Sequence, residues 1–421
     1  TSFGDGSGID RGANYNERFG RQFRISGSDL IEVFQNGTVT VLGTVPGGLQ
    51  AAMPYSFNTQ AIIANGNMFL YSPSGGFVQV TDTDLGFPID GVWVDGYYFL
   101  TDGEYIYHTD ITDETSIDTL KFATAEFMPD KSLGISKTQD NKVMVWGRYS
   151  LEYFVDVAQD NFAFQRIETR AQKIGIVATH AKCESSGHWY ITGGRKEDAV
   201  GVYVVSVGSA DKVSSREIDK IIAQYTEPQL SDMRMESRSE DDVTFILVHL
   251  PDYTLCFNES IAKVFGINAA WSILRTDIQG DATYRAINGV FDARIAKFIY
   301  GDKRDSTIGQ LDNTVFTHYS DAIEWLLYTP LLKLETASID EIDIETLPGN
   351  APDQDATVAL SQTSDGLAYS QEWWQLYGDN LDYNQRFVIY RVGYVADWVG
   401  FKLRGATKSR MSFAGLKITY G

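Results

Sequence analysis

The chain has 421 residues, of which 43% are hydrophobic and 22% charged, and its formal net charge is −21. This apolar content excludes a disordered chain. The charge excludes a typical nucleic-acid binder, because such proteins neutralise phosphates with a basic surface. Two cysteines, Cys183 and Cys256, are too few for a disulfide framework, and we expect both to be buried thiols. No apolar run approaches the length of a membrane span, and no signal peptide is recognisable.

Residues 1–20 are rich in glycine and aspartate, and we expect them to form a loop. A short apolar, aromatic-rich strand pattern then recurs seven times, at intervals of roughly thirty to fifty-five residues. Turn pairs such as Asn65-Gly66 and Asp95-Gly96 precede most copies. The copies begin at Phe23, Met68, Tyr97, Val143, Trp189, Thr244 and Lys297.

Such a repeat is typical of stacked units that are each too small to bury their own apolar face. It predicts an all-β protein in which residues 21–313 form a β-propeller of four-stranded blades. Seven copies indicate seven blades, or six if the first or last unit merges when the ring closes. Asn36-Gly37, between two β-rich runs, is the strongest hairpin signal.

The repeat stops after residue 313, and a different set of strand patterns follows. Residues 331–345 alternate apolar and acidic side chains, which is typical of a half-buried strand. Further strand patterns cover 357–361, 385–392, 399–404 and 411–419. We therefore expect residues 314–421 to form a C-terminal β-sandwich domain.

Charge is unevenly distributed along this C-terminal region. Ten acidic residues and no Lys or Arg lie between Glu335 and Leu381, whereas six basic residues and one acid lie between Arg386 and Arg410. One interpretation is that the acidic and the basic residues lie on two separate solvent-exposed faces. Alternatively, opposite charges meet across a head-to-tail interface between copies in a ring. The candidate oligomer-interface residues are then Arg386, Arg391, Arg404, Asp340, Asp343 and Glu345.

No residue pattern points to catalysis or to metal binding. Glycoside hydrolysis needs two carboxylates flanking one bond, and no pair among the 56 acidic residues has a distinguishing spacing. The five histidines lack the spacing of a zinc site. Trp373 and Trp374 beside Tyr377 suit sugar stacking, a buried core or an interface anchor equally well. We expect no catalytic residue, no metal site and no cofactor.

Nine motifs, taken in order, resemble the tail hub or nozzle proteins of short-tailed phages (podoviruses), also called packaged-DNA stabilisation proteins. Residues 147–154 (GRYSLEYF) are similar to the G-x-x-S-[IL]-E-Y-F segment of that family. The other eight are 172–176 (QKIGI), 218–226 (IDKIIAQYT), 249–251 (HLP), 271–274 (WSIL), 284–286 (YRA), 301–311 (GDK with GQL), 327–331 (LYTPL) and 400–409 (GFKLR with TKS). The family also carries a further N-terminal segment before its first blade.

The resemblance implies a virion tail protein without catalytic residues, assembled in the host cytoplasm. It implies a homo-oligomer, a ring of six copies below the portal and its adaptor, which carries tailspikes and a tail needle and retains packaged DNA until genome ejection. Double-stranded DNA is then expected to pass without tight binding, because an acidic wall repels phosphates. The alternative is a carbohydrate-binding or glycosidase-type β-propeller, which the aromatic content favours and the missing catalytic pair opposes.

Overall fold

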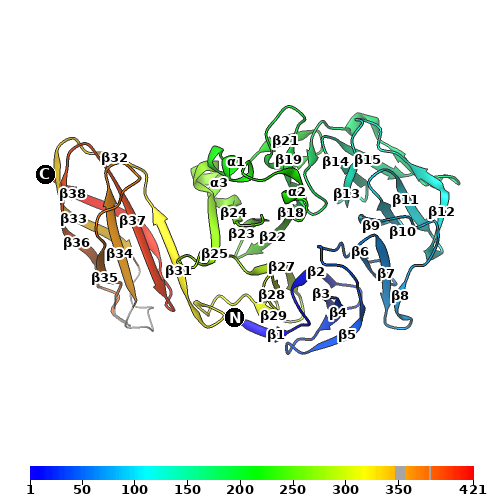
Figure 1. Cartoon of the computed structure of the whole chain (residues 1–421), viewed down its shortest axis with the longest axis horizontal. Helices are drawn as coiled ribbons and strands as arrows, with labels where there is room; N and C mark the ends of the chain where they lie inside the picture. The colour runs from blue at the N-terminus through cyan, green and yellow to red at the C-terminus, as the bar shows by residue number, and fades with distance from the viewer. Residues whose placement is uncertain (347–355, 379–380) are drawn as a thin grey trace. The chain divides into compact units, whose positions relative to one another are not determined.

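The computed structural model describes residues 1–346, 356–378 and 381–421, and their regular structure is almost entirely β (Figure 1), which confirms the all-β prediction. Two compact units are present. One comprises residues 2–274 and 285–311, and the other comprises residue 1, residues 275–284 and residues 312–421.

The first unit is a β-propeller of seven antiparallel sheets, counted over the described residues; the last residues of its sixth sheet, 275–277 and 282–283, belong to the second unit. Strands of neighbouring sheets lie side by side, with β27 beside β2, β9 beside β13 and β18 beside β22. Seven blades, rather than six, are therefore present. The first blade contains β2(Asp10–Asn16), β3(Arg21–Ser26), β4(Asp29–Val33) and β5(Val39–Thr44); the second contains β6(Gln60–Ala64), β7(Asn67–Ser72) and β8(Gly76–Gln79); and the third contains β9(Asp90–Val94), β10(Tyr97–Thr101), β11(Ile106–Asp110) and β12(Asp113–Ala123). The fourth blade contains β13(Ser132–Lys137), β14(Val143–Gly147), β15(Leu151–Asp156) and β16(Phe164–Arg166), and the fifth contains β17(Gly175–Ile176), β18(Lys182–Ser185), β19(His188–Gly194), β20(Gly201–Ser206) and β21(Ser209–Lys212). The sixth blade contains β22(Arg234–Glu240), β23(Val243–His249), β24(Thr254–Asn258), β25(Trp271–Asp277) and β26(Ala282–Thr283), and the seventh contains β27(Ala286–Asp292), β28(Lys297–Asp302), β29(Thr307–Gln310) and β1(Ser2–Asp5).

The turn pairs identified in the sequence close the hairpins between the first two strands of their blades. Asn65 and Gly66 both have positive φ (50° and 72°) and join β6 to β7. Asp95 and Gly96 do the same between β9 and β10, with φ of 50° and 99°. Such left-handed pairs match the twist of the strands that they connect, so local sequence specifies these turns.

The N-terminal strand completes the seventh blade. Residues 1–20 are not the loop that their composition suggested, because they contain β1 and β2. β1 pairs antiparallel with β29, with Ser2 opposite Gly309 and Asp5 opposite Thr307. The ring is thus closed by hydrogen bonds between the two ends of the propeller sequence.

Gly4 of β1 and Gly37, in the turn between β4 and β5, allow a close backbone contact at this closure. A Cβ atom on Gly4 would lie 2.1 Å from the Gly37 carbonyl oxygen, and one on Gly37 would lie 1.9 Å from the Phe3 carbonyl oxygen. Only residues without a side chain fit such a contact. Glycine content, which suggested a loop, here marks a strand packed against a neighbouring turn.

The propeller core lies between adjacent blades. One apolar cluster joins Trp146 and Leu151 of the fourth blade to Ile191 of the fifth and Ile246 of the sixth. Short helices lie in connections, and they are η1(Glu168–Arg170), α1(Arg216–Ile222), α2(Glu227–Leu230), α3(Glu259–Phe265) and η2(Ile267–Ala269). Burial between sheets explains why a single repeat cannot fold alone.

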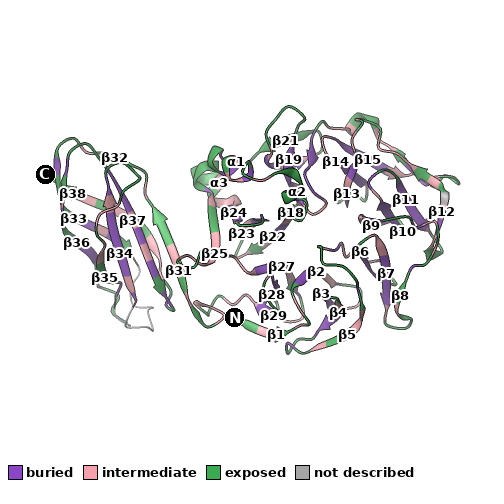
Figure 2. Cartoon of the chain, in the orientation of Figure 1, coloured by how far each residue is buried: buried purple, intermediate pink, exposed green. Residues whose placement is uncertain are grey.

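The second unit contains two antiparallel sheets that enclose one apolar core, as in a β-sandwich (Figure 2). Ile342, Ile344, Leu360 and Phe401 are among its buried residues. One sheet has the order β30(Thr317–His318), β31(Asp321–Tyr328), β37(Trp398–Thr407), β34(Thr357–Thr363) and β35(Trp373–Leu376), with β32(Leu332–Lys333) also paired to β37. The other has the order β36(Phe387–Val395), β33(Ala337–Thr346) and β38(Phe413–Tyr420).

Candidate functional site

Two of the candidate interface residues form an ion pair with each other within one chain. β33 directs Ile342 and Ile344 into the core and leaves Glu341 and Asp343 on the opposite face. Arg386, next to the neighbouring strand β36, donates to Glu341 at 3.0 Å and also to Asp343. Antiparallel pairing of β33 with β36 therefore brings together charges that lie more than forty residues apart.

A third candidate, Arg404, is held by Glu372 of the same chain. Its Nε and Nη2 atoms donate to the two carboxylate oxygens at 2.6 and 2.7 Å. Its guanidinium lies 5.1 Å from the centre of the Trp374 ring. The Arg404 hydrogen bond lowers the pKa of Glu372. The Arg404 side chain is thus held on the outer face of its sheet by Glu372 and by the Trp374 ring.

The remaining candidates are solvent-exposed. Arg391 has a positive φ of 58° at a β-bulge, where Arg391 and Val392 lie opposite Asp340 alone. Asp340 and Glu345 are also exposed. Arg391 forms no side-chain hydrogen bond or ion pair with any residue that the structure describes, and bulges commonly redirect a side chain. Within that part of the chain, Arg386 and Arg404 have carboxylate partners and Arg391 does not.

The tryptophan pair identified in the sequence does not form an aromatic platform. Trp373 packs against the core, and Tyr377 is buried, with its hydroxyl donating to the Ser412 carbonyl at 3.1 Å. Trp374 is exposed, and Arg404 lies against its ring. These contacts favour the buried-core interpretation for Trp373 and Tyr377.

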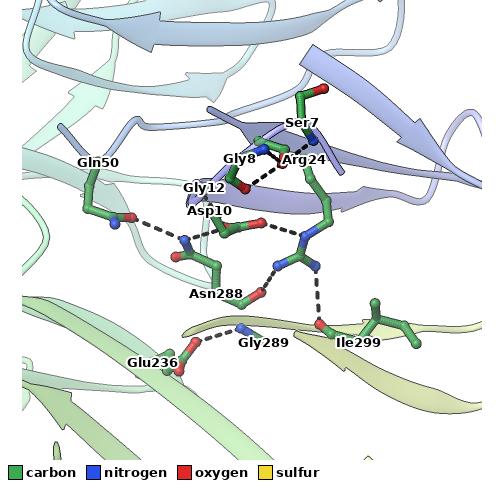
Figure 3. Close-up of polar contacts among 11 residues, drawn as sticks. Ser7, Gly8, Asp10, Gly12, Arg24, Gln50, Glu236, Asn288, Gly289 and Ile299 are labelled. Carbon is green, nitrogen blue, oxygen red and sulfur yellow. Dashed lines mark hydrogen bonds and ion pairs between the residues drawn. The ribbon is translucent and has the colours of Figure 1, made fainter. Parts of the chain in front are cut away.

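A buried polar network joins the first and last blades (Figure 3). Arg24 of β3 donates from Nε to Asp10 of β2 at 2.7 Å and from Nη2 to the Asn288 carbonyl of β27 at 2.8 Å. The Asn288 side chain donates to the other oxygen of Asp10 at 2.6 Å. Burial raises the pKa of Asp10, and the charge of Arg24 opposes this effect.

Asn288 lies at the centre of this network in an unusual conformation. Its φ is 56°, and it lies in a bulge where the register of β27 with β28 shifts. The next residue, Gly289, donates its N–H to Glu236 of the sixth blade at 2.6 Å. Polar contacts therefore link the first, sixth and seventh blades at the closure of the ring.

Glu236 also binds a buried histidine. His249 Nε2 lies 2.5 Å from Glu236 Oε1, and His249 Nδ1 lies 3.2 Å from the Thr254 hydroxyl. Burial, followed by the charge of Lys303, lowers the pKa of His249 to about 4. Burial alone would raise the pKa of Glu236, but His249 and the Gly289 N–H outweigh it and lower that pKa to about 2.

None of the candidate residues predicted from the sequence belongs to this closure network. One signal was available, because Arg24 interrupts an apolar strand pattern between Phe23 and Ile25. A buried arginine requires a partner, but its partners Asp10 and Asn288 lie on other strands, one of them in another blade. Their identity depends on how the ring closes.

Neither region resembles a catalytic centre. Over the described residues, no three His, Cys, Asp or Glu side chains gather as ligands for a metal ion. The carboxylates of the closure network are engaged by Arg24, Asn288, His249 and backbone N–H groups. In the part of the chain that the structure describes, no helix is long and apolar enough to span a bilayer.

Comparison with known proteins gave matches over both units. Residues 1–316 match a family model described as the β-propeller of bacteriophage P22 Gp10, and residues 324–421 match its β-sandwich. The tail hub protein gp10 of Salmonella phage P22 is 27% identical over 439 residues, covering 98% of this chain and 88% of that protein.

Similarity to solved structures is low. A catalytically inactive virginiamycin B lyase from Staphylococcus aureus has a TM-score of 0.47 and 9% identity, covering 74% of this chain and 97% of the lyase. The extracellular domain of a one-component system from B. thetaiotaomicron has a TM-score of 0.46 and 8% identity, covering 77% of this chain and 40% of that chain. Neither similarity carries a functional argument.

Proposed function

Because the chain belongs to the bacteriophage P22 Gp10 family of tail hub proteins, we propose that it forms a ring that extends the portal-adaptor channel of a phage tail. The chain is a structural tail component of the virion and not an enzyme. In the proposed role it assembles in the host cytoplasm as a homo-oligomer of six copies and docks the tail needle and tailspikes. The match of both domains, in order, supports this proposal most strongly.

The structure of the propeller suits a rigid scaffold. Its ring is closed by β1 on β29 and by buried contacts of Arg24 and Asn288. Rigid elements hold exposed loops in fixed positions, which is what docking of several neighbours requires. The proposal therefore assigns mechanical support to the propeller and assembly contacts to its loops and to the sandwich.

We further propose that DNA slides past the ring without binding tightly. A net charge of −21 per chain repels phosphates at short range. Retention of the genome then depends on the needle as a plug. In mobility-shift assays with a short duplex, we expect no binding by the assembled ring at 150 mM salt. Tight binding with a steep dependence on salt would contradict this part of the proposal.

Assembly can be tested at the exposed arginine. Reversal of Arg386, Arg391 and Arg404 together would also break the intrachain pairs of Arg386 and Arg404, so Arg391→Glu is the cleaner variant. We expect Arg391→Glu to reduce ring formation in light scattering while the far-UV circular dichroism stays unchanged. Lys196→Glu, at an exposed position of the propeller, is the matched control. An unchanged oligomer would contradict a role for Arg391.

A further inference from the structure

A cavity of about 300 Å³ lies in the third blade, at a place that the proposed function does not use. The loop before β9, the turn between β10 and β11, and the edge strand β12 form its walls. Its lining combines carboxylates with aromatic rings, and no Lys or Arg is among the lining residues. The carboxylates are those of Asp84, Asp102 and Asp118, and the aromatic rings are those of Tyr105, Tyr107 and Phe122.

Two of the three carboxylates are held in place by backbone N–H groups. Asp102 Oδ1 accepts from the N–H groups of Glu104 and Tyr105 at 2.9 and 2.7 Å. Asp118 Oδ1 accepts from the N–H of Leu120 at 2.9 Å. Within the described residues no Lys or Arg forms an ion pair with Asp84, Asp102 or Asp118; Lys121 lies near enough to interact electrostatically with Asp118, but its ion pair is with Asp110. The cavity thus carries three carboxylates whose oxygens no basic side chain occupies.

The aromatic walls are also fixed. The rings of Tyr105 and Phe122 meet edge to face, 5.1 Å apart, and their side chains are 37% and 47% exposed. The Tyr107 hydroxyl donates to the Leu85 carbonyl at 2.7 Å. Carboxylates beside aromatic faces recognise a cation on an apolar stem, the chemistry of an arginine or lysine side chain.

The neighbouring strand suits an extended partner. β12 is the outer strand of its sheet, and no other described strand pairs with its free edge. Leu120, on β12, is 80% exposed and lies two residues from both Asp118 and Phe122. Exposed apolar residues on an unpaired edge are typical of a surface that another chain covers.

We propose that this cavity binds an arginine or lysine side chain from an extended segment of a different tail protein. This inference rests on the proposed tail hub function and names the chemistry of one partner. The charge of the cavity requires a basic partner, and a second copy of a chain with net charge −21 is a poor source of one. The cavity supplies the anchor, and β12 supplies an edge for the backbone beside it.

Site-specific photo-crosslinking in assembled virions tests the proposal. A photoreactive amino acid replaces Leu120, and crosslinked peptides are identified by mass spectrometry. We expect one predominant product with another virion protein, at a segment that contains Arg or Lys. Asp102→Asn combined with Asp118→Asn is expected to lower its yield roughly five- to tenfold, because charge-assisted contacts are lost.

The controls separate charge from folding. The side-chain oxygen of asparagine can accept the same backbone N–H hydrogen bonds that Asp102 and Asp118 accept, so both variants keep the local turns. Asp211→Asn makes the same type of charge change at an exposed residue on the outer strand of another blade and is expected to leave the yield unchanged. Thermal unfolding of the purified variants checks that the blade is intact.

Three results would overturn the inference. They are a product between two copies of this chain, a product insensitive to the Asp→Asn changes, and the absence of any product in virions that contain the chain. Absence of the chain from purified virions would instead refute the proposed function, so the two failures are distinguishable.

Discussion

Asn288 and Asp10 lie 278 positions apart in the chain, yet the amide of Asn288 donates to the carboxylate of Asp10 over 2.6 Å. Arg24 binds the other oxygen of Asp10 and the backbone carbonyl of Asn288. The first and last blades of the propeller are therefore joined by a buried, charged contact as well as by the β1–β29 pairing. The stability of the closed ring should depend on both.

Removal of the buried arginine should destabilise the propeller strongly. We expect Arg24→Met to lower the free energy of unfolding by about 3–5 kcal/mol, because the buried Asp10 carboxylate would lose the cation that is hydrogen-bonded to it. Urea denaturation monitored by tryptophan fluorescence measures the change. The double variant Arg24→Met/Asp10→Asn should be less destabilised than the single variant. Equal or larger loss in the double variant would show that the charge pair is not the cause.

The glycine contact at the ring closure predicts a second effect. A Cβ atom at Gly4 would lie 2.1 Å from the Gly37 carbonyl oxygen, so Gly4→Ala should displace β1 and cost about 1–3 kcal/mol. Gly48→Ala is the matched control, since no atom lies within 4 Å of the corresponding Cβ position. Thermal unfolding of both variants is the measurement. Similar midpoints for the two would argue against a tight closure.

Buried histidine should make stability depend on pH. Burial lowers the pKa of His249 to about 4 in the folded chain, whereas an unfolded histidine has a pKa of about 6.5. Between these two pH values the unfolded chain therefore binds a proton at His249 and the folded chain does not. Stability is therefore full above pH 6.5 and falls as the pH decreases toward 4, by at most about 3 kcal/mol from this residue. Burial shifts the pKa of His180 in the same direction, so it adds to the loss. Protonation of Glu236 reduces stability mainly at pH values below this range, because the pKa of Glu236 is lowered to about 2.

A variant can isolate the part due to His249. Gln at position 249 keeps an N–H donor for Glu236 but does not titrate, so His249→Gln should reduce the slope of unfolding free energy against pH between 6.5 and 4.5. Urea denaturation at several pH values gives this slope. If the slope of the variant equals that of the unchanged chain, another group is responsible.

The sandwich offers a test of the paired arginine. Arg404→Met removes a bidentate contact with Glu372 and the packing on Trp374, and we expect a loss of about 1 kcal/mol because the pair is partly exposed. Arg391→Met should change stability by less than about 0.5 kcal/mol, since that side chain is exposed. Thermal unfolding of the two variants compares them directly. A larger loss for Arg391→Met would reverse the assignment of their roles.

Local sequence was sufficient for the repeating part of the architecture. Seven strand patterns with turn pairs such as Asn65-Gly66 predicted a propeller, because hairpin turns and strand alternation depend on neighbouring residues. The alternation of Ile342 and Ile344 with acidic residues likewise predicted β33, but the single strand expected over residues 331–345 is divided into β32 and β33, with Thr336 at a positive φ between them. The motifs from residue 147 onward indicated the family to which the chain belongs.

Only the tertiary structure decided how the ring closes and which charges remain available. β1 was hidden in a glycine-rich segment because its partner, β29, lies about three hundred residues away, and no local pattern encodes a pairing at that distance. Arg386 and Arg391 look equivalent in the sequence and both are exposed, yet strand pairing gives Arg386 two carboxylate partners, whereas Arg391 has none among the described residues. Local periodicity specifies the elements, whereas contacts between distant segments exist only after the sheets have assembled.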